Sequence, residues 1–218
     1  MIYLLPLIWV RFLVANLLFE NELIGFNNIG RLIPDIYRNP DRKLKKMKKS
    51  RVLKCHEYFD PKYRKIIYII RDPRDVAVSY YFFHLGEKKI PNNFPIERYM
   101  SKFISGKLDP YGTWTENIGS WLDARKINPK FLVLFYEKMI SQIETEVKRI
   151  ANFLGKKPDS STLKKVIELS SATYLRKLSK TIEYYIRKPR NFSFVRSVKS
   201  GEGQSVLPKS SVQQIKDK

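Results

Sequence analysis

Cysteine and histidine are scarce in this chain of 218 residues. The one cysteine, Cys55, excludes an internal disulfide bond and suits a reducing compartment, so we expect a cytoplasmic protein. The two histidines, His56 and His84, are too few for a histidine-rich metal site, and no cysteine–histidine spacing indicates zinc. The sequence therefore predicts a protein without a metal cofactor.

Long apolar runs are also lacking. The most apolar segment, MIYLLPLIWVRFLVANLLF at the amino terminus, is interrupted by Pro6, Arg11 and Asn16. Its longest uncharged run is about half of the ~20 residues that span a bilayer, and no signal-peptide cleavage pattern follows it. We expect no transmembrane segment and interpret residues 8–19 as a largely buried helix. The large apolar residues of this helix are Trp9, Phe12, Leu13, Leu17 and Leu18.

Acidic residues are few relative to basic ones. The chain has 21 acidic residues against 42 lysines and arginines, which gives a net charge of +21. Such a charge attracts polyanions, anionic membrane surfaces or acidic substrates, and by itself it selects none of them. We interpret most of it as solvated surface and expect no nucleic-acid partner. The cluster RKLKKMKKSR, residues 42–51, is the best candidate for a polyanion-binding surface, the alternative function that the charge leaves open.

An alternation of strand and helix patterns fills the rest of the chain. Apolar residues make up 43% of the sequence, enough for the core of one domain over residues 1–218. The segments RVLKCH, KIIYII and FLVLFY predict strands. Residues 96–105, TENIGSWLDARK and SQIETEVKRIANFLG predict helices, the last of them ended by Gly155. The alternation favours an α/β fold with a parallel β-sheet flanked by helices, and from about Arg187 onward the basic, polar sequence predicts a functional loop.

The segment IIYIIRDPRDVAVSYYFF, residues 66–83, joins a strand pattern to a helix pattern. Asp72 can cap a helix that has Pro73 at its first position, so Arg71 is expected at the carboxyl end of the strand. Ligands of open α/β sheets bind at that end, and a helix amino terminus adds free N–H groups. The junction between strand and helix therefore predicts an anion-binding site. We interpret Arg74 and Asp75 as capping and salt-bridging residues rather than as ligands of the anion.

The order and separation of several segments resemble the sulfotransferases that use 3′-phosphoadenosine 5′-phosphosulfate (PAPS). These segments are VLKCHEYF, KIIYIIRDPRDVAVSYYFFH, YGTWTENIGSWLDARK, FLVLFYEKM, IANFLGKK and FVRSVKSGEG. The resemblance covers nearly the whole chain, and its most specific part is the Arg-Asp-Pro-Arg-Asp-x-x-x-Ser-Tyr-Tyr run. It implies a P-loop-NTPase-like sulfotransferase fold, with PAPS as the sulfuryl donor, PAP (3′-phosphoadenosine 5′-phosphate) as the product and no metal.

The resemblance implies that the anion bound at the junction between strand and helix is the 3′-phosphate of the nucleotide. It implies that Arg71 and Ser79 hold this phosphate, and a guanidinium and a hydroxyl about two helical turns apart suit that role. Tyr136 resembles a tyrosine that contacts the adenine, although a core tyrosine has the same pattern. The remaining implied nucleotide contacts are Ser170, Ser171, Arg196, Lys199 and Gly201.

Two departures from the family pattern affect these contacts. The loop that closes over the 3′-phosphate, placed within residues 187–218, often carries Arg-Lys-Gly in the family. Here Ser197 and Val198 follow Arg196, and Lys199 and Gly201 are the expected compensation. Ala172 stands where many members have an aromatic residue that covers the adenine.

The resemblance places the chemistry at the Lys-x-His motif, here Lys54 and His56. His56 is expected to be the base that takes the acceptor's proton, and Lys54 to stabilise charge on the transferring sulfuryl group. Glu57 is the reserve base, although a surface glutamate is the simpler interpretation, and His84 lacks this motif context. The implied acceptor is a hydroxyl or amine of a small molecule, glycan or lipid, in a pocket shaped by residues 20–40 and 84–110.

The family's Pro-Lys-Ser-Gly-Thr-Thr-Trp-like loop, which binds the 5′-phosphosulfate, has no counterpart ahead of Trp9, although residues 1–20 resemble the helix that follows it. We therefore expect the first strand and that loop to be missing, and the chain as written to be inactive. Three accounts of this are a late start or frameshift, a truncated pseudogene product and a protein that has lost catalysis. A noncatalytic PAP binder is accordingly an alternative function.

Overall fold

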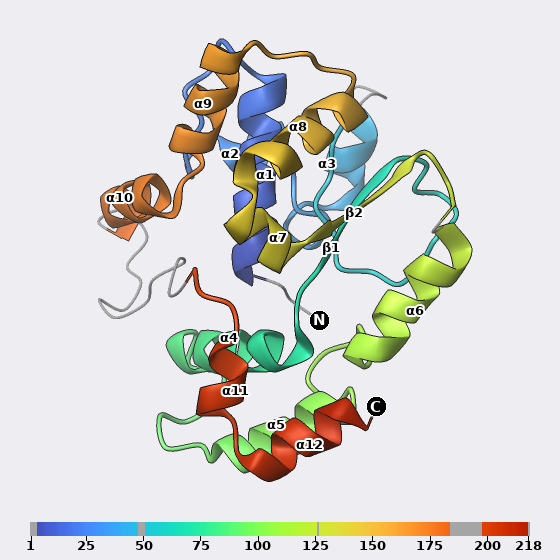
Figure 1. Ribbon diagram of the computed structural model, residues 1–218, viewed down its shortest axis with the longest axis vertical. Coiled ribbons are helices and arrows are strands. Elements are labelled where there is room, and N and C mark those ends of the chain that lie inside the picture. The colour runs from blue at the N-terminus through green and yellow to red at the C-terminus, as the bar shows by residue number, and fades with distance from the viewer. Residues whose placement is uncertain (1–3, 48–50, 126, 184–197, 218) are drawn as a thin grey trace. The chain divides into compact units, whose positions relative to one another are not determined.

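The computed structural model describes residues 4–47, 51–125, 127–183 and 198–217 (Figure 1). The chain divides into two compact units. The sheet unit comprises Met1–Leu4, His56–Ser141 and Ser197–Lys218, and the helical unit comprises Leu5–Cys55 and Gln142–Arg196.

The sheet unit is built around two parallel strands, β1 (Ile66–Ile70) and β2 (Phe131–Phe135). Their register pairs Ile66 with Phe131 and Ile70 with Phe135, so both carboxyl ends lie at one edge. The strands predicted in KIIYII and FLVLFY are confirmed, and so is the α/β fold class with its small parallel sheet. β2 is less buried than its apolar sequence suggests, because Phe135 is 42% exposed.

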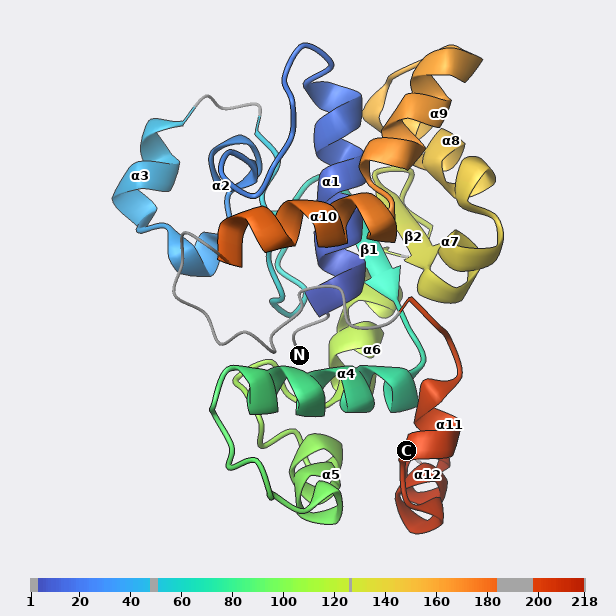
Figure 2. The ribbon, with the colours of Figure 1, turned by 90° about the vertical axis from the view of Figure 1, so that its left-hand side faces the viewer.

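Six helices accompany this sheet among the described residues. They are α4 (Pro73–Gly86), α5 (Ile96–Ile104), α6 (Trp114–Arg125), α7 (Tyr136–Ser141), α11 (Glu202–Val206) and α12 (Lys209–Lys216). The predicted helices at 96–105 and in TENIGSWLDARK are thus confirmed. α11 packs against α4, and α12 packs against α4 and α5 (Figures 1 and 2). The fully buried large residues of this unit are Tyr99, Met100, Leu134, Tyr136 and Met139.

The helical unit contains α1 (Leu4–Leu18) and six further helical segments among the described residues. These are α2 (Ile29–Leu32), the 3-10 helix η1 (Ile36–Arg38), α3 (Asp41–Lys46), α8 (Ile143–Leu154), α9 (Ser160–Leu169) and α10 (Ala172–Glu183). Phe12, Leu13 and Leu17 are buried, as predicted for the first helix. Gly155 ends α8 at φ 76°, which confirms its predicted role as a left-handed cap. Among the described residues, no helix has the length and apolar character needed to cross a membrane.

Two predictions of local structure are wrong. RVLKCH forms no strand, because its pairing is confined to a single bridge between Asp35 and Lys54, after which the partner chain turns into η1. The region after Arg187 is also more ordered than a loop where it is described. Its residues 202–216 form α11 and α12 around the buried Leu207 and Val212, since these apolar residues have a core to pack against.

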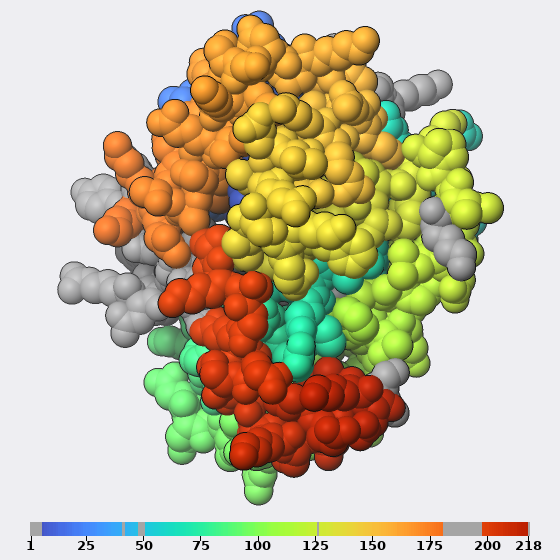
Figure 3. All heavy atoms as spheres, viewed as in Figure 1, coloured from blue at the N-terminus to red at the C-terminus, as the bar shows by residue number. Residues whose placement is uncertain are grey.

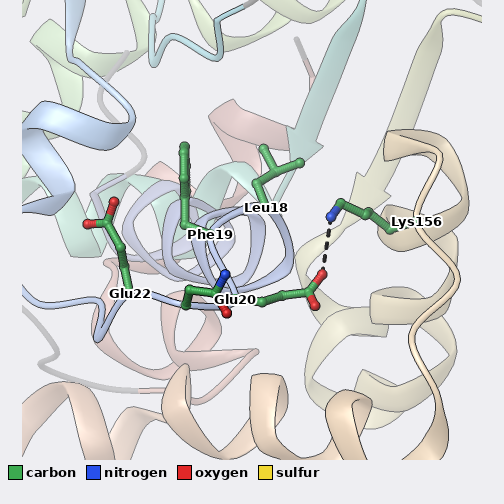
Figure 4. Close-up of a pocket in the computed structure, with 6 residues that line it drawn as sticks. Leu18, Phe19, Glu20, Glu22 and Lys156 are labelled. Carbon is green, nitrogen blue, oxygen red and sulfur yellow. Dashed lines mark hydrogen bonds and ion pairs between the residues drawn. The ribbon is translucent and has the colours of Figure 1, made fainter.

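The end of α1 borders a pocket of the helical unit (Figure 4). The pocket is lined by Leu18, Phe19, Glu20, Asn21, Glu22 and Lys156. Lys156 Nζ and Glu20 Oε1 form an ion pair of 3.1 Å there. None of the residues predicted to bind a nucleotide or act in catalysis lines this pocket.

Candidate functional site

Arg71 directly follows β1 and precedes the first turn of α4, as the sequence predicts. Asp72 caps α4 by accepting a hydrogen bond from the Arg74 backbone N–H at 2.8 Å, and Pro73 is the first helical residue. The backbone on either side is held by long-range bonds. Trp114 Nε1 donates to the Arg71 carbonyl at 3.1 Å, and the Asp72 N–H donates to Glu137 Oε1 at 3.0 Å. The chain at the carboxyl end of β1 is therefore fixed by α6 and α7.

The guanidinium of Arg71 is buried, with 2% of the residue exposed. Its Cζ lies 4.4 Å from the centroid of the Tyr136 ring, and Nη2 donates to the Lys199 carbonyl at 3.4 Å. Nη2 also lies 3.7 Å from Asp75 Oδ2. The Arg71 Nε atom is buried and has no hydrogen-bond partner among the described residues. The side chain is thus held in one orientation while a strong donor of a buried cation stays unused.

Asp75 connects Arg71 to the carboxyl-terminal part of the sheet unit. Its Oδ2 accepts from the Gly201 N–H at 2.8 Å, and Oδ1 accepts from the Gly203 N–H at 2.7 Å. Gly203 approaches α4 closely, because a Cβ there would lie 2.5 Å from the Arg74 carbonyl carbon. The salt-bridging role predicted for Asp75 is confirmed, and Arg74 pairs with Asp72.

Tyr136 follows β2 at the same edge of the sheet and is 0% exposed. Burial raises the pKa of its hydroxyl to about 12, against an opposing effect of the Arg71 cation. Its ring supports the Arg71 guanidinium. Tyr136 is therefore a core residue, which was one of the two interpretations that the sequence allowed. Its contact with the adenine stays a prediction.

Ser79 lies in α4, two turns after Arg71, and is half-buried. Within the described part of the chain its hydroxyl makes no hydrogen bond. Lys199 and Gly201 are exposed and contact Arg71 and Asp75 through backbone atoms. Arg196 lies outside the described residues. The structure thus brings Arg71, Lys199 and Gly201 together.

His56 is 7% exposed and packs beside Tyr111, with 5.7 Å between the ring centroids. Asn117 of α6 donates to the His56 carbonyl at 3.4 Å and accepts from the Tyr68 hydroxyl of β1 at 2.8 Å. The next residue is held by the same helix, since Trp121 Nε1 donates to the Glu57 carbonyl at 2.9 Å. α6 therefore fixes the backbone of the predicted base.

Lys54 belongs to the helical unit and is paired with Asp35, at 2.7 Å between Nζ and Oδ2. Its Nζ lies 5.8 Å from the centroid of the Tyr37 ring. Burial lowers the pKa of Lys54, and the bond to Asp35 opposes that effect. The side chain is a half-buried cation whose charge is compensated by Asp35.

Ser170 and Ser171 also belong to the helical unit. Ser170 is 0% exposed, and its Oγ accepts from Asn16 Nδ2 at 3.2 Å. Ser171 Oγ accepts from the Tyr174 N–H at 3.2 Å, at the start of α10. Both hydroxyls therefore have structural bonds within their own unit.

The two remaining titratable candidates have local partners. Glu57 accepts a hydrogen bond from the Tyr63 hydroxyl and lies 3.7 Å from Lys62 Nζ. His84 is 7% exposed, with its Nδ1 3.1 Å from the Tyr99 hydroxyl. Burial lowers the pKa of His84 to about 4.

Three residues that fix this site were not expected from the sequence: Trp114, Asn117 and Glu137. Each bonds to the backbone of a predicted site residue or of its neighbour through a side chain from another element. The segment YGTWTENIGSWLDARK contains two of them, but the sequence pattern indicates only a helix there. The sequence around a residue gives no signal that its side chain bonds to a backbone atom more than forty positions away.

Comparisons with known proteins indicate one family. The family model of the sulfotransferase domain matches residues 7–217. Sulfotransferase 1E1 of Bos taurus is 37% identical over 137 residues, which are 60% of this chain and 46% of that protein. Sulfotransferase 1E1 of Cavia porcellus is 34% identical over 144 residues, 63% and 48% of the two chains. The chain thus spans about half the length of these relatives.

Solved structures show the same fold. Retinol dehydratase in complex with androsterone and the inactive cofactor PAP has a TM-score of 0.80 at 18% identity, over 96% of this chain and 75% of that one. Mouse sulfotransferase SULT7A1 complexed with PAP has a TM-score of 0.69 at 24% identity, over 81% and 66%. Because the domain model matches residues 7–217, which run through both units, the chain belongs to the sulfotransferase family.

Proposed function

We propose that this protein transfers a sulfuryl group from PAPS to a hydroxyl or amine acceptor, and that Arg71 holds the 3′-phosphate of the donor. The observation that carries the proposal is the buried Arg71 guanidinium at the end of β1. Its Nε has no hydrogen-bond partner among the described residues. A buried cation with an unused donor is costly, and a phosphate oxygen would satisfy it.

The surroundings of Arg71 suit a phosphate in two further ways. The amino-terminal end of α4, a helix of 14 residues, lies directly after Arg71 and contributes the positive end of its dipole. The Ser79 hydroxyl on the same helix makes no bond to any described residue. Both features support the 3′-phosphate site that the family resemblance implies.

The donor supplies an activated sulfuryl group, and the chain supplies proton transfer and charge stabilisation. In the proposed reaction His56 takes the proton of the acceptor hydroxyl while the acceptor oxygen forms a bond to sulfur. The bond between sulfur and the phosphate oxygen of the donor breaks in the same step. The packing of His56 beside Tyr111 and the hold of Asn117 on its backbone support a fixed ring. Lys54, whose charge is paired with Asp35, is the residue that the family resemblance implies for stabilising charge on the sulfuryl group.

A lipophilic alcohol is the acceptor that we favour among small molecules, glycans and lipids. Two solved neighbours contain such molecules: one retinol dehydratase complex holds androsterone and another holds retinol, each together with PAP. Both compounds carry a hydroxyl group on an apolar skeleton. A cytoplasmic location also belongs to this proposal, and the presence of a single cysteine, Cys55, supports it.

Calorimetry with PAP and AMP tests the site, because the two nucleotides differ by the 3′-phosphate. We expect tighter binding of PAP and expect Arg71→Ala to reduce that preference by about tenfold or more, the effect of a charge-assisted bond. Arg31→Ala is the matched control, since it removes the same charge from a side chain that is 67% exposed. Equal affinity for both nucleotides would refute the site.

The same titrations separate two alternative functions. A noncatalytic nucleotide binder would show the PAP preference and no sulfuryl transfer to any acceptor. A polyanion-binding protein would use the exposed lysines of α3, which are Lys43, Lys45 and Lys46. Its binding would fall steeply with salt and would not respond to Arg71→Ala.

A further inference from the structure

Asp75 lies between the proposed phosphate-binding arginine and a segment more than a hundred residues later in the chain. It is 1% exposed and stands one helical turn after Arg71. Its two oxygens accept the N–H groups of Gly201 and Gly203 at 2.8 and 2.7 Å. The oxygen that binds Gly201 is also the one that lies 3.7 Å from Arg71 Nη2.

The segment of residues 199–206 touches Arg71 directly as well. Arg71 Nη2 donates to the Lys199 carbonyl at 3.4 Å. Of the polar neighbours of Arg71, the Lys199 carbonyl belongs to the 199–206 segment, and the Asp75 carboxylate accepts hydrogen bonds from it. A buried carboxylate needs donors, and undocking would remove two of those that Asp75 has.

A separate contact fastens the same segment to α4. Arg74 Nη1 donates to Gln204 Oε1 at 2.6 Å, and Gly203 packs on the Arg74 backbone too closely for a Cβ. α11 accordingly lies beside α4 (Figure 1), and Figure 2 shows it at the amino-terminal end of that helix. The space-filling view shows α11 and α12, in red, as one continuous surface of the sheet unit (Figure 3).

We propose that Asp75 is a positioning residue that couples binding of the 3′-phosphate at Arg71 to docking of the 199–206 segment. The inference rests on the proposed function and adds the residue that links nucleotide recognition to the carboxyl-terminal segment. With the segment docked, Asp75 and the Lys199 carbonyl hold Nη2 and leave Nε for the phosphate. Because coupling between two binding events is reciprocal, a phosphate bound in this orientation stabilises the docked segment by the same factor.

Amide hydrogen exchange of the unmodified protein is the first test. Exchange at Gly201 and Gly203 reports opening of their bonds to Asp75. At equal saturation, PAP is expected to slow exchange at both amides at least about fivefold more than AMP does. Equal protection by the two nucleotides, or none by PAP, would overturn the coupling. No variant is involved, so the test holds even where Asp75 cannot be replaced without unfolding.

Asp75→Asn is the second test, because asparagine keeps one acceptor oxygen and removes the charge and the second acceptor. We expect PAP affinity to fall about tenfold and AMP affinity to change less than about twofold. The matched control is Glu146→Gln in the helical unit. Glu146 is 2% exposed, against 1% for Asp75, and lies 2.6 Å from Arg149, so the control removes the charge of a buried, paired carboxylate and keeps the PAP preference.

The outcomes separate the two proposals. If the unmodified protein binds PAP and AMP equally, the proposed function fails, and the coupling fails with it. If it prefers PAP and Asp75→Asn keeps that preference, only the coupling fails. An equal loss of both nucleotides in Asp75→Asn would show a purely structural role and would also overturn the inference.

Discussion

The guanidinium of Arg71 lies over the ring of Tyr136, with Cζ 4.4 Å from the ring centroid. These residues follow the two parallel strands, β1 and β2, at the edge where both strands end. An aromatic face attracts a cation most strongly where water is excluded, and both residues are almost fully buried. The pair therefore orients the Arg71 guanidinium without using its Nε donor.

Replacing Tyr136 distinguishes a supporting ring from an adenine contact through the hydroxyl. Tyr136→Phe keeps the ring, so we expect PAP affinity to change less than about threefold. Tyr136→Leu removes the cation–π interaction, worth about 2 kcal/mol when desolvated, and should weaken PAP binding by more than about tenfold. Calorimetry on both variants is the measurement. A large loss of affinity in Tyr136→Phe alone would indicate that the hydroxyl binds the nucleotide.

The join between β1 and α4 was predictable because its determinants are local. The β-branched run of Ile66–Ile70, the cap at Asp72 and the proline at the first helical position all lie within eight residues. Gly155 at the end of α8 is equally local, since only its own left-handed conformation is needed. The local features of the junction determine the position of Arg71 at the end of β1, and therefore the position of the proposed anion site.

Long-range features were not predictable. RVLKCH has strand-like residues, but whether it becomes a strand depends on a partner that pairs with Lys54 alone. The bonds of Asp75 to Gly201 and Gly203 join residues 126 and 128 positions apart, and one sequence contains no signal for them. The same holds for Trp114, whose indole binds the Arg71 carbonyl across 43 positions.

The close approach of Gly203 to α4 predicts the effect of a single methyl group. In Gly203→Ala the new Cβ would lie 2.5 Å from the Arg74 carbonyl carbon and Cβ, so α11 must shift. We expect a loss of about 1–3 kcal/mol in the free energy of unfolding, as for other overpacked contacts. Urea denaturation measures it.

Gly30→Ala is the control for that experiment. Gly30 lies within α2, and a Cβ there would meet no atom within 4 Å. Alanine is a better helix former than glycine, so this variant should be neutral or more stable by up to about 1 kcal/mol. If both alanine variants behaved alike, the tight packing of Gly203 on Arg74 would not exist in solution.

His56 is expected to act in proton transfer and not in nucleotide binding. The test uses a form of the protein that carries a complete phosphosulfate loop. In that protein His56→Gln should lower the rate of sulfuryl transfer to an alcohol by about 10² or more, with PAP affinity nearly unchanged. His84→Gln, the control for loss of an imidazole, should keep most of the rate. The reverse pattern would assign the base to His84.

The buried His84 predicts how stability depends on pH. Burial lowers its pKa to about 4, with Lys89 acting in the same direction and Asp109 and Glu87 opposing, whereas the unfolded chain has the ordinary value of about 6.5. Between these values the unfolded state binds more protons, so the stability from a neutral His84 is complete above pH 6.5. It is lost as pH falls toward 4, by on the order of 2 kcal/mol. Tyr99 faces the ring with its hydroxyl 3.1 Å from Nδ1, and burial raises the pKa of that hydroxyl, so it remains a neutral hydrogen-bond partner of the imidazole.

Urea denaturation of the unmodified protein and of His84→Gln, from pH 4 to pH 7.5, should give curves that differ in slope only below about pH 6.5. Parallel curves over the whole range would mean that His84 titrates alike in the folded and unfolded chains, and the burial seen in α4 would then have no energetic consequence for its proton.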